Sequence, residues 1–487
     1  MGIIAKQSIY NVLSIALAFI IGAFNMLFLY PKFLGKEFQG LIVALLANSN
    51  LIQPFVSFGV QHTLIKYFSD SKTQKQRDRL LWFSLLLPLV ILSAIIPLYY
   101  YFNIQILNFL TNSNKTVLGF PVLILAIAIS TAYFEIFFSW LRVHLQSIFG
   151  NFLKEVYPRF LTFILLISFA FELIGIDKFI LFLIIGYYLR LLIVALYSFY
   201  IYTPKFEFKL PQAWLSMLRY SSLIFLSGAA ASFILDIDKS MIYTLTSNEN
   251  VAFYAVALYI ATVIEAPGRA MFQITSPLVA KALNENDTKR LEVLLKKSST
   301  NLMIVSGFVF LIINLNLNDF YLIINQEGYS SAASVVIIVS MGKFFSMSMG
   351  CLNNIISNSK YYTYVFWFSI ISAFLAIVLN YTFIESYGII GAAVATLMVI
   401  LFINSCKIVL VAILFKIHPY SKKSLGIMMS LIFIYLIIFN IPSFINPIIS
   451  IVTRSLFILG LFIVPLFKFK WSSDIEEIFT KVKSRLF

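Results

Sequence analysis

Charged residues are scarce in this sequence: Asp, Glu, Lys and Arg make up 12% of its 487 residues. A soluble domain carries about 25% charged residues, so water cannot be the main solvent of this chain. Its two cysteines, Cys351 and Cys406, have no Cys-x-x-Cys partner, which disfavours a disulfide framework or a zinc cluster. The three histidines, His62, His144 and His418, have no metal-ligand spacing. The sequence therefore predicts neither a metal site nor a cofactor.

Long apolar runs take the place of the missing charge, and 60% of the residues are hydrophobic. A membrane-spanning helix needs about 20 apolar residues, and such runs follow one another from Ser8 to Phe467 with only short polar breaks. The first run is too long for a signal-peptide core and lacks a small-residue cleavage site, so we expect it to be retained. We predict an all-α polytopic membrane protein with about fourteen transmembrane helices. Their approximate bounds are 8–30, 39–60, 80–102, 117–140, 160–176, 179–202, 220–245, 253–279, 302–324, 331–356, 364–384, 388–415, 425–441 and 448–467.

The distribution of positive charge predicts the topology. A net charge of +15 would suit a nucleic-acid ligand in a soluble protein, but in a membrane protein the cations mark the cytoplasmic side. With the amino terminus inside, most of the 36 Lys and Arg fall in cytoplasmic segments, and both termini are cytoplasmic. The external segments hold only Lys32, Lys36, Lys115 and Lys178. We therefore expect no nucleic-acid partner, and we interpret the cytoplasmic clusters as topology determinants that contact anionic headgroups.

An internal similarity indicates two repeats. In both, a span is followed by a short external turn (35–40 or 247–252), a span with a mid-helix proline (Pro54 or Pro267) and a basic connector. Any helical hairpin in a membrane would show part of this pattern, but an even number of intervening spans predicts two pseudo-symmetric lobes of about six helices around a central cavity, an arrangement suited to alternating access. The predicted parts are an N-terminal lobe (1–202), a cytoplasmic linker (203–219), a C-terminal lobe (220–415), two extra C-terminal helices (416–467) and a basic cytoplasmic tail (468–487).

Ionisable side chains at bilayer depth cost about 2.5–3.5 kcal/mol each on insertion scales, so they are functional candidates. Asp236 and Lys239 are three residues apart and Glu265 and Arg269 four apart, spacings that suit ion pairs within one helix. Asp238 would lie on a different face from that pair. For the four paired residues, structural neutralisation and direct contact with a substrate or ion both remain open.

Lys343 has no acidic neighbour in its own helix and needs either a carboxylate from another span or an anionic substrate. Arg190 follows the same logic, whereas Lys407 and Arg454 lie nearer span ends, where the charge reaches the interface at little cost. An excess of buried cations would suit a phosphate, although spacing alone does not distinguish phosphate from carboxylate. The candidate substrate-binding cations are Lys343, Arg190, Arg269 and Lys239, and the candidates for ion coupling are Asp236, Asp238 and Glu265.

Residues 380–396 resemble the junction of the eleventh and twelfth spans in polysaccharide exporters of the multidrug/oligosaccharidyl-lipid/polysaccharide (MOP) superfamily; they read NYTFIESYGIIGAAVAT. Residues 238–242 (DKSMI), followed by an external turn and Tyr254, are similar to the seventh-span pattern of that family, and Pro277-Leu278 continues the match. Ala252 stands where a glycine is usual, which weakens the match at that turn. The resemblance covers essentially the whole chain in length, span count and repeat order.

This resemblance implies a Wzx-type flippase of the bacterial inner membrane. Such a protein carries undecaprenyl-pyrophosphate-linked oligosaccharide, the repeat unit of O-antigen, capsule or exopolysaccharide, from the cytoplasmic to the periplasmic leaflet. It implies alternating access coupled to a gradient of H⁺ or Na⁺, and a possible complex with a polysaccharide polymerase or chain-length protein. No covalent chemistry is required, so the chain is expected not to be an enzyme.

Two other functions compete with this one. A multidrug or cation exporter of the same superfamily would need a cavity weighted toward acids, and the buried cations argue against it. A membrane polymerase, ligase or glycosyltransferase generally has a large external loop or an acidic catalytic motif. The longest external connection here is about 103–116, and neither a pair of loop carboxylates nor a Ser/His/Asp set is evident.

Overall fold

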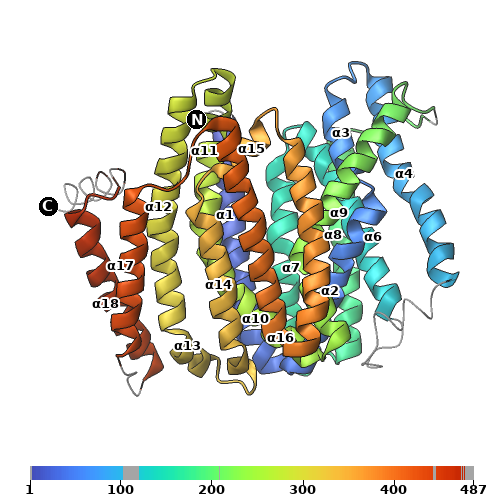
Figure 1. Ribbon diagram of the computed structural model, residues 1–487. Coiled ribbons are helices and arrows are strands. Elements are labelled where there is room, and N and C mark those ends of the chain that lie inside the picture. Colours follow the sequence, from blue (N-terminus) through green and yellow to red (C-terminus); the bar gives the residue numbers. More distant parts are fainter. Residues whose placement is uncertain are drawn as a thin grey trace. The chain divides into compact units, whose positions relative to one another are not determined.

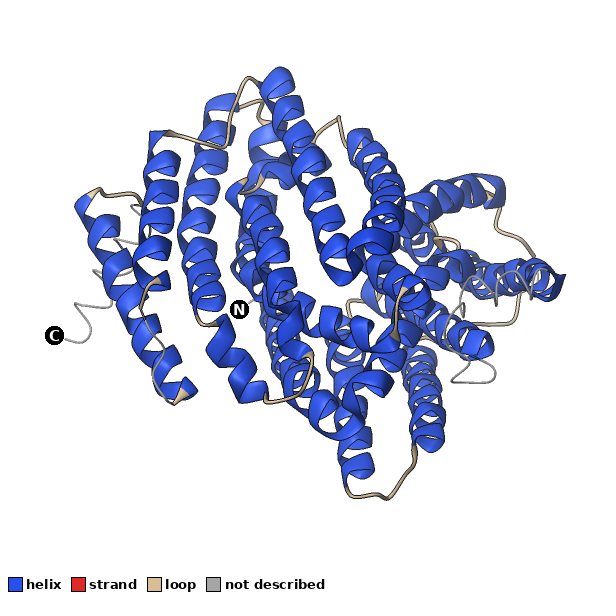
Figure 2. Ribbon diagram, turned by 60° about the horizontal axis from the view of Figure 1, so that its bottom comes forward, coloured by secondary structure: helices blue, strands red, loops and turns tan. Residues whose placement is uncertain are grey.

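A computed structural model describes residues 3–101, 120–207, 209–441 and 446–472, together with Asp474 and Glu477. Throughout these residues the regular secondary structure is helical, which confirms the all-α fold class (Figure 2). The expected external loop 103–116 with Lys115, and the tail residues Lys481, Lys483 and Arg485, lie outside the described residues.

Ten helical stretches in the described part of the chain are long and apolar enough to cross a membrane, so the protein is a multi-pass membrane protein. Two of them are longer than a single membrane crossing requires: Leu13–Ser57 has 45 residues and Thr363–Phe415 has 53. Since about 20 residues at 1.5 Å each span the apolar core, each of these stretches holds two crossings. The chain reverses at Gly35 and Gly388, whose φ angles are +76° and +58°. The predicted total of about fourteen spans remains a prediction.

The contacts within the chain divide it into two compact units, Met1–Ala252 and Phe253–Phe487. This division follows packing, whereas the predicted lobes follow the repeat, so the lobe bounds remain a prediction. Unit 1 contains the following helices: α1 (Ile3–Phe24), a π-helix (Asn25–Leu34), α2 (Gly35–Ser57), α3 (Val60–Phe68), α4 (Gln74–Tyr101), α6 (Phe120–Val143), α7 (Ser147–Ala170), α8 (Ile176–Ile201) and α9 (Trp214–Leu245).

Helix α9 joins unit 1 because it packs closely along α2 and α3. A side chain at Gly59 would place its Cβ 2.6 Å from the Ser221 carbonyl oxygen, so only glycine allows this approach. The hydroxyl oxygens of Thr63 and Ser221 are 2.6 Å apart, and the Ser240 hydroxyl donates to Asn48 Oδ1 at 2.6 Å. Small residues and interhelical hydrogen bonds of this kind hold helices together in lipid. We call this contact, marked by Gly59, Thr63 and Asn48 on one side and Ser221 and Ser240 on the other, the α2–α9 seam.

Unit 2 begins within α10 and continues to the carboxyl terminus. Its helices are α10 (Asn248–Thr262), a 3₁₀ turn (Val263–Glu265), α11 (Ala266–Asn284), α12 (Thr288–Leu315), α13 (Leu317–Ile324), a second 3₁₀ turn (Tyr329–Ala332), α14 (Ala333–Ser348), α15 (Leu352–Asn358), α16 (Thr363–Phe415), α17 (Lys422–Phe439) and α18 (Pro447–Lys468). The last two helices lie side by side and pack against α12 (Figure 1).

A buried ion pair fastens α18 to α13. Arg454 Nη1 lies 2.7 Å from Asp319 Oδ2, and the Ser450 hydroxyl donates to the same oxygen at 2.9 Å. Arg454 also donates to the Ile441 carbonyl at 2.9 Å. The prediction that the Arg454 charge reaches the membrane interface is wrong, because a buried acid that sequence reasoning overlooked neutralises it inside the protein.

The segment after α18 returns to the amino-terminal end of α12. Asp474 lies 2.6 Å from Lys297 Nζ and accepts a hydrogen bond from Asn301 at 2.9 Å. Burial raises the pKa of Asp474, but the hydrogen bonds from Lys297 and Asn301 outweigh burial and leave the pKa below its usual value. The basic α11–α12 connection and this segment therefore share one side of the unit.

Candidate substrate and ion site

The span predicted for residues 253–279 is one helical run that tightens locally near its middle. Helix α10 ends at Thr262, a 3₁₀ turn covers Val263–Glu265, and α11 starts at Ala266 with Pro267 in its first turn. Proline is well tolerated there because its missing N–H would have no partner in the first helical turn. A 3₁₀ stretch within a longer helix often marks a functional hinge.

Glu265, at the end of this turn, pairs with Lys343 on α14. The distance from Lys343 Nζ to Glu265 Oε1 is 2.9 Å, and the two side chains are 17% and 23% exposed. The expectation that Lys343 needs a carboxylate from another span or an anionic substrate is thus met by a carboxylate. Gly268, one turn later on α11, leaves room for Met347 of α14 and brings the two helices together.

The expected alternative pair, Glu265 with Arg269, is not formed in the described residues. Their spacing of four assumed one continuous α-helix, and the 3₁₀ turn changes the direction of the Glu265 side chain relative to α11. Arg269 is exposed on α11, and no ion pair within the described residues includes it. Arg269 is therefore a cation close in sequence to the Glu265–Lys343 pair. Within the described residues, no carboxylate forms an ion pair with it.

The pair predicted on α9 is confirmed. Lys239 Nζ forms an ion pair with Asp236 and donates to the Leu235 carbonyl at 3.0 Å. Asn50, on α2, donates to the other Asp236 oxygen at 3.1 Å, a contact that sequence reasoning missed. Asp238 accepts a hydrogen bond from the Lys239 backbone N–H at 2.8 Å and is 4% exposed. These groups belong to the polar lining of the α2–α9 seam.

Arg190, on α8, is 4% exposed and lies among aromatic rings. Its guanidinium carbon is 4.3 Å from the Phe134 ring centre and 4.7 Å from that of Tyr187. Nη2 is 3.4 Å from the Thr131 hydroxyl, and Nε has no hydrogen-bond partner in the described residues. The π faces compensate part of the buried charge, and the described residues provide no carboxylate in ion-pair contact with it.

The candidates thus fall into two groups. Arg190, Asp236, Asp238 and Lys239 belong to unit 1, and Glu265, Arg269 and Lys343 belong to unit 2. Direct contacts join Asp236 with Lys239, and Glu265 with Lys343.

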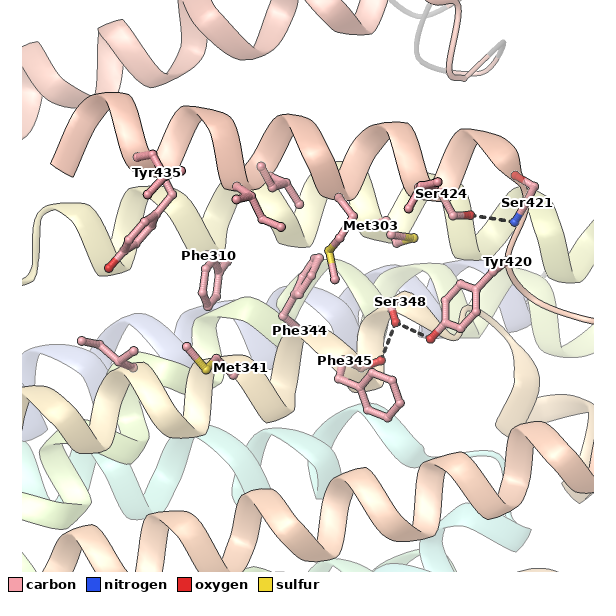
Figure 3. A pocket seen from close by; sticks show the side chains of 16 residues that line it. Met303, Phe310, Met341, Phe344, Phe345, Ser348, Tyr420, Ser421, Ser424 and Tyr435 are labelled. Atoms are coloured by element: carbon pink, nitrogen blue, oxygen red, sulfur yellow. Dashed lines mark hydrogen bonds between the residues drawn. The ribbon is translucent and has the colours of Figure 1, made fainter. Parts of the chain in front are cut away.

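A large apolar pocket of about 690 Å³ lies beside the Lys343 site, between α12, α14 and α17. Phe310, Phe344 and Tyr435 point into it, and at one end the Ser348 and Tyr420 hydroxyls are 2.8 Å apart (Figure 3). We call it the α17 groove. No sequence signal predicted it, because its lining looks like ordinary lipid-facing residues until the helices are assembled.

Helix α14 carries both features on different faces. Phe344, Phe345 and Ser348 line the α17 groove, whereas Lys343 faces Glu265 and Met347 faces Gly268. At about 100° per residue, these groove residues point away from Lys343. One helix therefore separates a charged site from an apolar one.

Comparison with solved structures defines the class of protein. Lipid II flippase MurJ, in an inward closed conformation, matches 95% of this chain and 100% of its own with a TM-score of 0.70 and 17% identity. An inward-facing MATE family multidrug resistance transporter of the MOP superfamily matches 84% of this chain and 96% of its own, with a TM-score of 0.58 and 13% identity. The Vibrio cholerae MATE transporter VcmN matches the same shares with a TM-score of 0.53 and 15% identity. The fold is that of the MOP-type flippases and transporters.

The sequence identifies the family within that class. The model of the polysaccharide biosynthesis protein family matches residues 4–267, more than half of the chain. This protein belongs to that family, which confirms the family resemblance; the matched residues include 238–242 but not 380–396. A comparison with curated proteins finds no match.

Proposed function

We propose that this protein moves an undecaprenyl-pyrophosphate-linked oligosaccharide from the cytoplasmic to the periplasmic leaflet of a bacterial inner membrane by alternating access. The observation that carries the proposal is the construction of α14. Lys343 contacts the 3₁₀ turn Val263–Glu265 on one face of this helix, and the α17 groove lies on another. A lipid-linked saccharide combines an anionic phosphate with a long apolar chain, and these two neighbouring sites match those two parts.

The Glu265–Lys343 pair supplies an exchange step. An ammonium group binds phosphate strongly in a low-dielectric site, and Lys343 is paired with Glu265 before the substrate arrives. The pyrophosphate would displace the carboxylate when it binds Lys343, and the pair would form again when the headgroup leaves. Glu265 is the candidate for ion coupling at this site, and the coupling ion is H⁺ or Na⁺.

The remaining candidates take secondary roles in the proposal. Arg269 is the second cation for the pyrophosphate, since it is exposed and lies one helical turn from Glu265. Arg190 is a further anion contact in unit 1. Lys239, Asp236 and Asp238 are weaker candidates for substrate or ion contact, because the pair and the bond from Asn50 already occupy them.

We further propose how the protein is oriented in the membrane. Both termini lie in the cytoplasm, on the side of the basic α11–α12 connection. The oligosaccharide would pass to a polymerase or chain-length complex in the periplasm. No observation on the described residues favours a multidrug exporter or a polymerase over this function.

Reconstitution tests the proposal. Purified protein in liposomes should transfer a fluorescent undecaprenyl-pyrophosphate-linked saccharide to the opposite leaflet, where a membrane-impermeant reagent quenches it, and an acidic compartment should change the rate. Ethidium, a cationic drug substrate, should not be moved. Transport of ethidium without transfer of the lipid would replace the flippase assignment with a drug exporter.

Gene deletion gives the matching test in cells. Complete pyrophosphate-linked repeat units should accumulate on the cytoplasmic leaflet. Accumulation of incomplete sugars would indicate a biosynthetic enzyme instead.

A further inference from the structure

The residues that follow α18 connect two other helices of unit 2. Lys423, in the first turn of α17, donates from Nζ to the Lys470 carbonyl at 2.8 Å. Asp474 lies 2.6 Å from Nζ of Lys297, on α12. The connection therefore joins the amino-terminal parts of α12 and α17, two of the helices that form the walls of the α17 groove. We call Lys470, Trp471, Ser472 and Asp474 the C-terminal strap.

The strap lies at the hydroxyl end of the α17 groove. Trp471 is 5% exposed and belongs to the same buried apolar cluster as Met303 and Phe344 of the groove lining. Gly426, in the second turn of α17, lies against the Trp471 ring, since a Cβ there would be 3.5 Å from Nε1. The groove residues at this end are Tyr420, Ser421 and Ser424 (Figure 3). The strap thus packs where an apolar chain from the side predicted to be cytoplasmic would enter.

The polar contacts of the strap match those of a phosphate site. Lys297 Nζ and Asn301 Nδ2 reach the two oxygens of the Asp474 carboxylate, at 2.6 and 2.9 Å. The Ser472 hydroxyl donates to Asn301 Oδ1 at 2.6 Å, which leaves the amide N–H directed at the carboxylate. An ammonium and an amide N–H that converge on one anion are donors that a phosphate group also uses. Asp474 therefore occupies a place that suits a phosphate.

Another anion can replace Asp474 in these contacts. The Lys297 and Asp474 side chains are 49% and 35% exposed, and an ion pair this exposed adds little stability. A pyrophosphate carries more negative charge than one carboxylate, and its hydrogen bonds from an ammonium are strong. The pair of Arg454 with Asp319, which anchors α18, is buried and not open to such exchange. The strap can therefore be released while α18 stays in place.

We propose that Lys297 and Asn301 form an entry site for the phosphate of a lipid, and that the C-terminal strap closes this site until such a lipid arrives. The inference rests on the proposed function and adds a step before the headgroup reaches Lys343. The phosphate displaces Asp474, the strap leaves the end of the groove together with Trp471, and the apolar chain enters between α12 and α17. The strap is thus an autoinhibitory contact that keeps lipids without a phosphate out of the groove.

The test follows the opening of the strap in the purified full-length protein. A Ser472→Cys reporter, with Cys351 and Cys406 replaced by Ala, places one thiol in the strap. Ser472 is 5% exposed, so a membrane-impermeant maleimide should label the reporter slowly while the strap is closed and faster once it opens. Farnesyl pyrophosphate is the phosphorylated probe, and farnesol is the same chain without phosphate. Inorganic pyrophosphate supplies the anion without a chain, and phosphatidylglycerol supplies the headgroup of a membrane phospholipid.

Three variants of the reporter separate the entry site from the strap. Asp474→Ala removes the carboxylate that closes the site, and Lys297→Gln removes the ammonium that would bind the phosphate. Lys296→Gln is the matched control, since Lys296 pairs with Glu292 on α12 itself.

Both pyrophosphate compounds should speed the labelling of the reporter about 5-fold, a factor that corresponds to the loss of one exposed ion pair, and farnesol and phosphatidylglycerol should not. Asp474→Ala should be labelled about 5-fold faster than the reporter without any ligand, because nothing holds the strap to Lys297. Lys297→Gln should also be labelled faster, and pyrophosphate should no longer change its rate. Lys296→Gln should respond as the reporter does.

The inference fails if pyrophosphate leaves the labelling rate unchanged, if farnesol is as effective as farnesyl pyrophosphate, or if Asp474→Ala is labelled as slowly as the reporter. Equal acceleration by phosphatidylglycerol would assign the contact to membrane phospholipid and overturn its role in substrate entry. Lipid transfer by the wild type in any of these cases would leave the proposed function standing without the strap. Opening triggered by pyrophosphate in a protein that transfers no lipid-linked saccharide would instead refute the proposed function and keep the entry site.

Discussion

A lysine at bilayer depth costs free energy without a partner, and Lys343 takes its partner from the 3₁₀ turn that precedes α11. The pair with Glu265 is 2.9 Å long and only partly buried, so water or a substrate oxygen can replace the carboxylate. A fully buried pair, such as Arg454 with Asp319, has no such access. The two pairs therefore differ in kind: one suits exchange and the other suits anchoring.

Charge removal at the exchangeable pair tests its role. Lys343→Gln should lower stability by about 2 kcal/mol, because it leaves Glu265 without its charged hydrogen-bond partner, and it should abolish lipid transfer. The double variant Lys343→Gln/Glu265→Gln should regain the wild-type unfolding temperature in detergent, since no unpaired charge remains, but not transfer. Recovery of transfer in the double variant would show that Lys343 acts only as a structural counter-ion.

At the scale of single residues, the sequence identified the buried charged residues better than it identified the groups that they contact. Asp236 with Lys239 followed from spacing, because both lie on one unbroken helix. The partner of Lys343 did not, because Glu265 is distant in sequence and the spacing argument paired it with Arg269.

Among the elements, α18 depends on one contact with α13. Asp319→Ala should destabilise the protein by about 3–5 kcal/mol, because Arg454 is then left buried without a counter-charge. Asp319→Leu combined with Arg454→Met should restore much of that loss, as apolar replacement of a buried pair often does. Thermal unfolding in detergent measures both, and Lys36→Ala, which breaks the exposed pair with Glu249, is a control expected to change stability by less than about 1 kcal/mol. Equal stability of Asp319→Ala and wild type would contradict the anchoring role.

Hydropathy predicted where the helices occur, but not whether each predicted span is one regular helix. Every predicted span overlaps a helix in the described residues, because long apolar runs have few alternatives to a helix in lipid. The 3₁₀ stretch at Val263–Glu265 was missed because a proline in a span is compatible with either a regular or a locally tightened helix. The reversal at Gly388 was expected, since the Tyr387-Gly388 turn was part of the family resemblance.

For the whole molecule, the central question is which contacts must open during transport. The α2–α9 seam joins segments of the two predicted repeats, and at the end predicted to be cytoplasmic the hydroxyl oxygens of Thr63 and Ser221 are 2.6 Å apart. Two cysteine sulfurs at these positions would need to approach to about 2.0 Å to form a disulfide. If the repeats separate there to admit a substrate from the inner leaflet, a covalent bond across the seam must stop the cycle.

Thr63→Cys/Ser221→Cys, in a background with Cys351 and Cys406 replaced by Ala, should therefore lose lipid transfer on oxidation and regain it on reduction. The two single-cysteine variants are the controls and should be insensitive to oxidant. Full transfer by the oxidised double variant would show that α3 and α9 move as one body, as the packing units suggest, and that access opens elsewhere.

The reversal at Gly388 also bears on how the chain enters the membrane. A residue with a side chain would be strained at its φ of +58°, and a side chain at Gly391 would overlap the Phe383 carbonyl. The two halves of α16 thus meet without a loop that the translocation machinery could thread separately. We expect the two halves of α16 to insert into the membrane together as a helical hairpin. The tight turn, and not the charges that flank it, would then set the orientation of the second half.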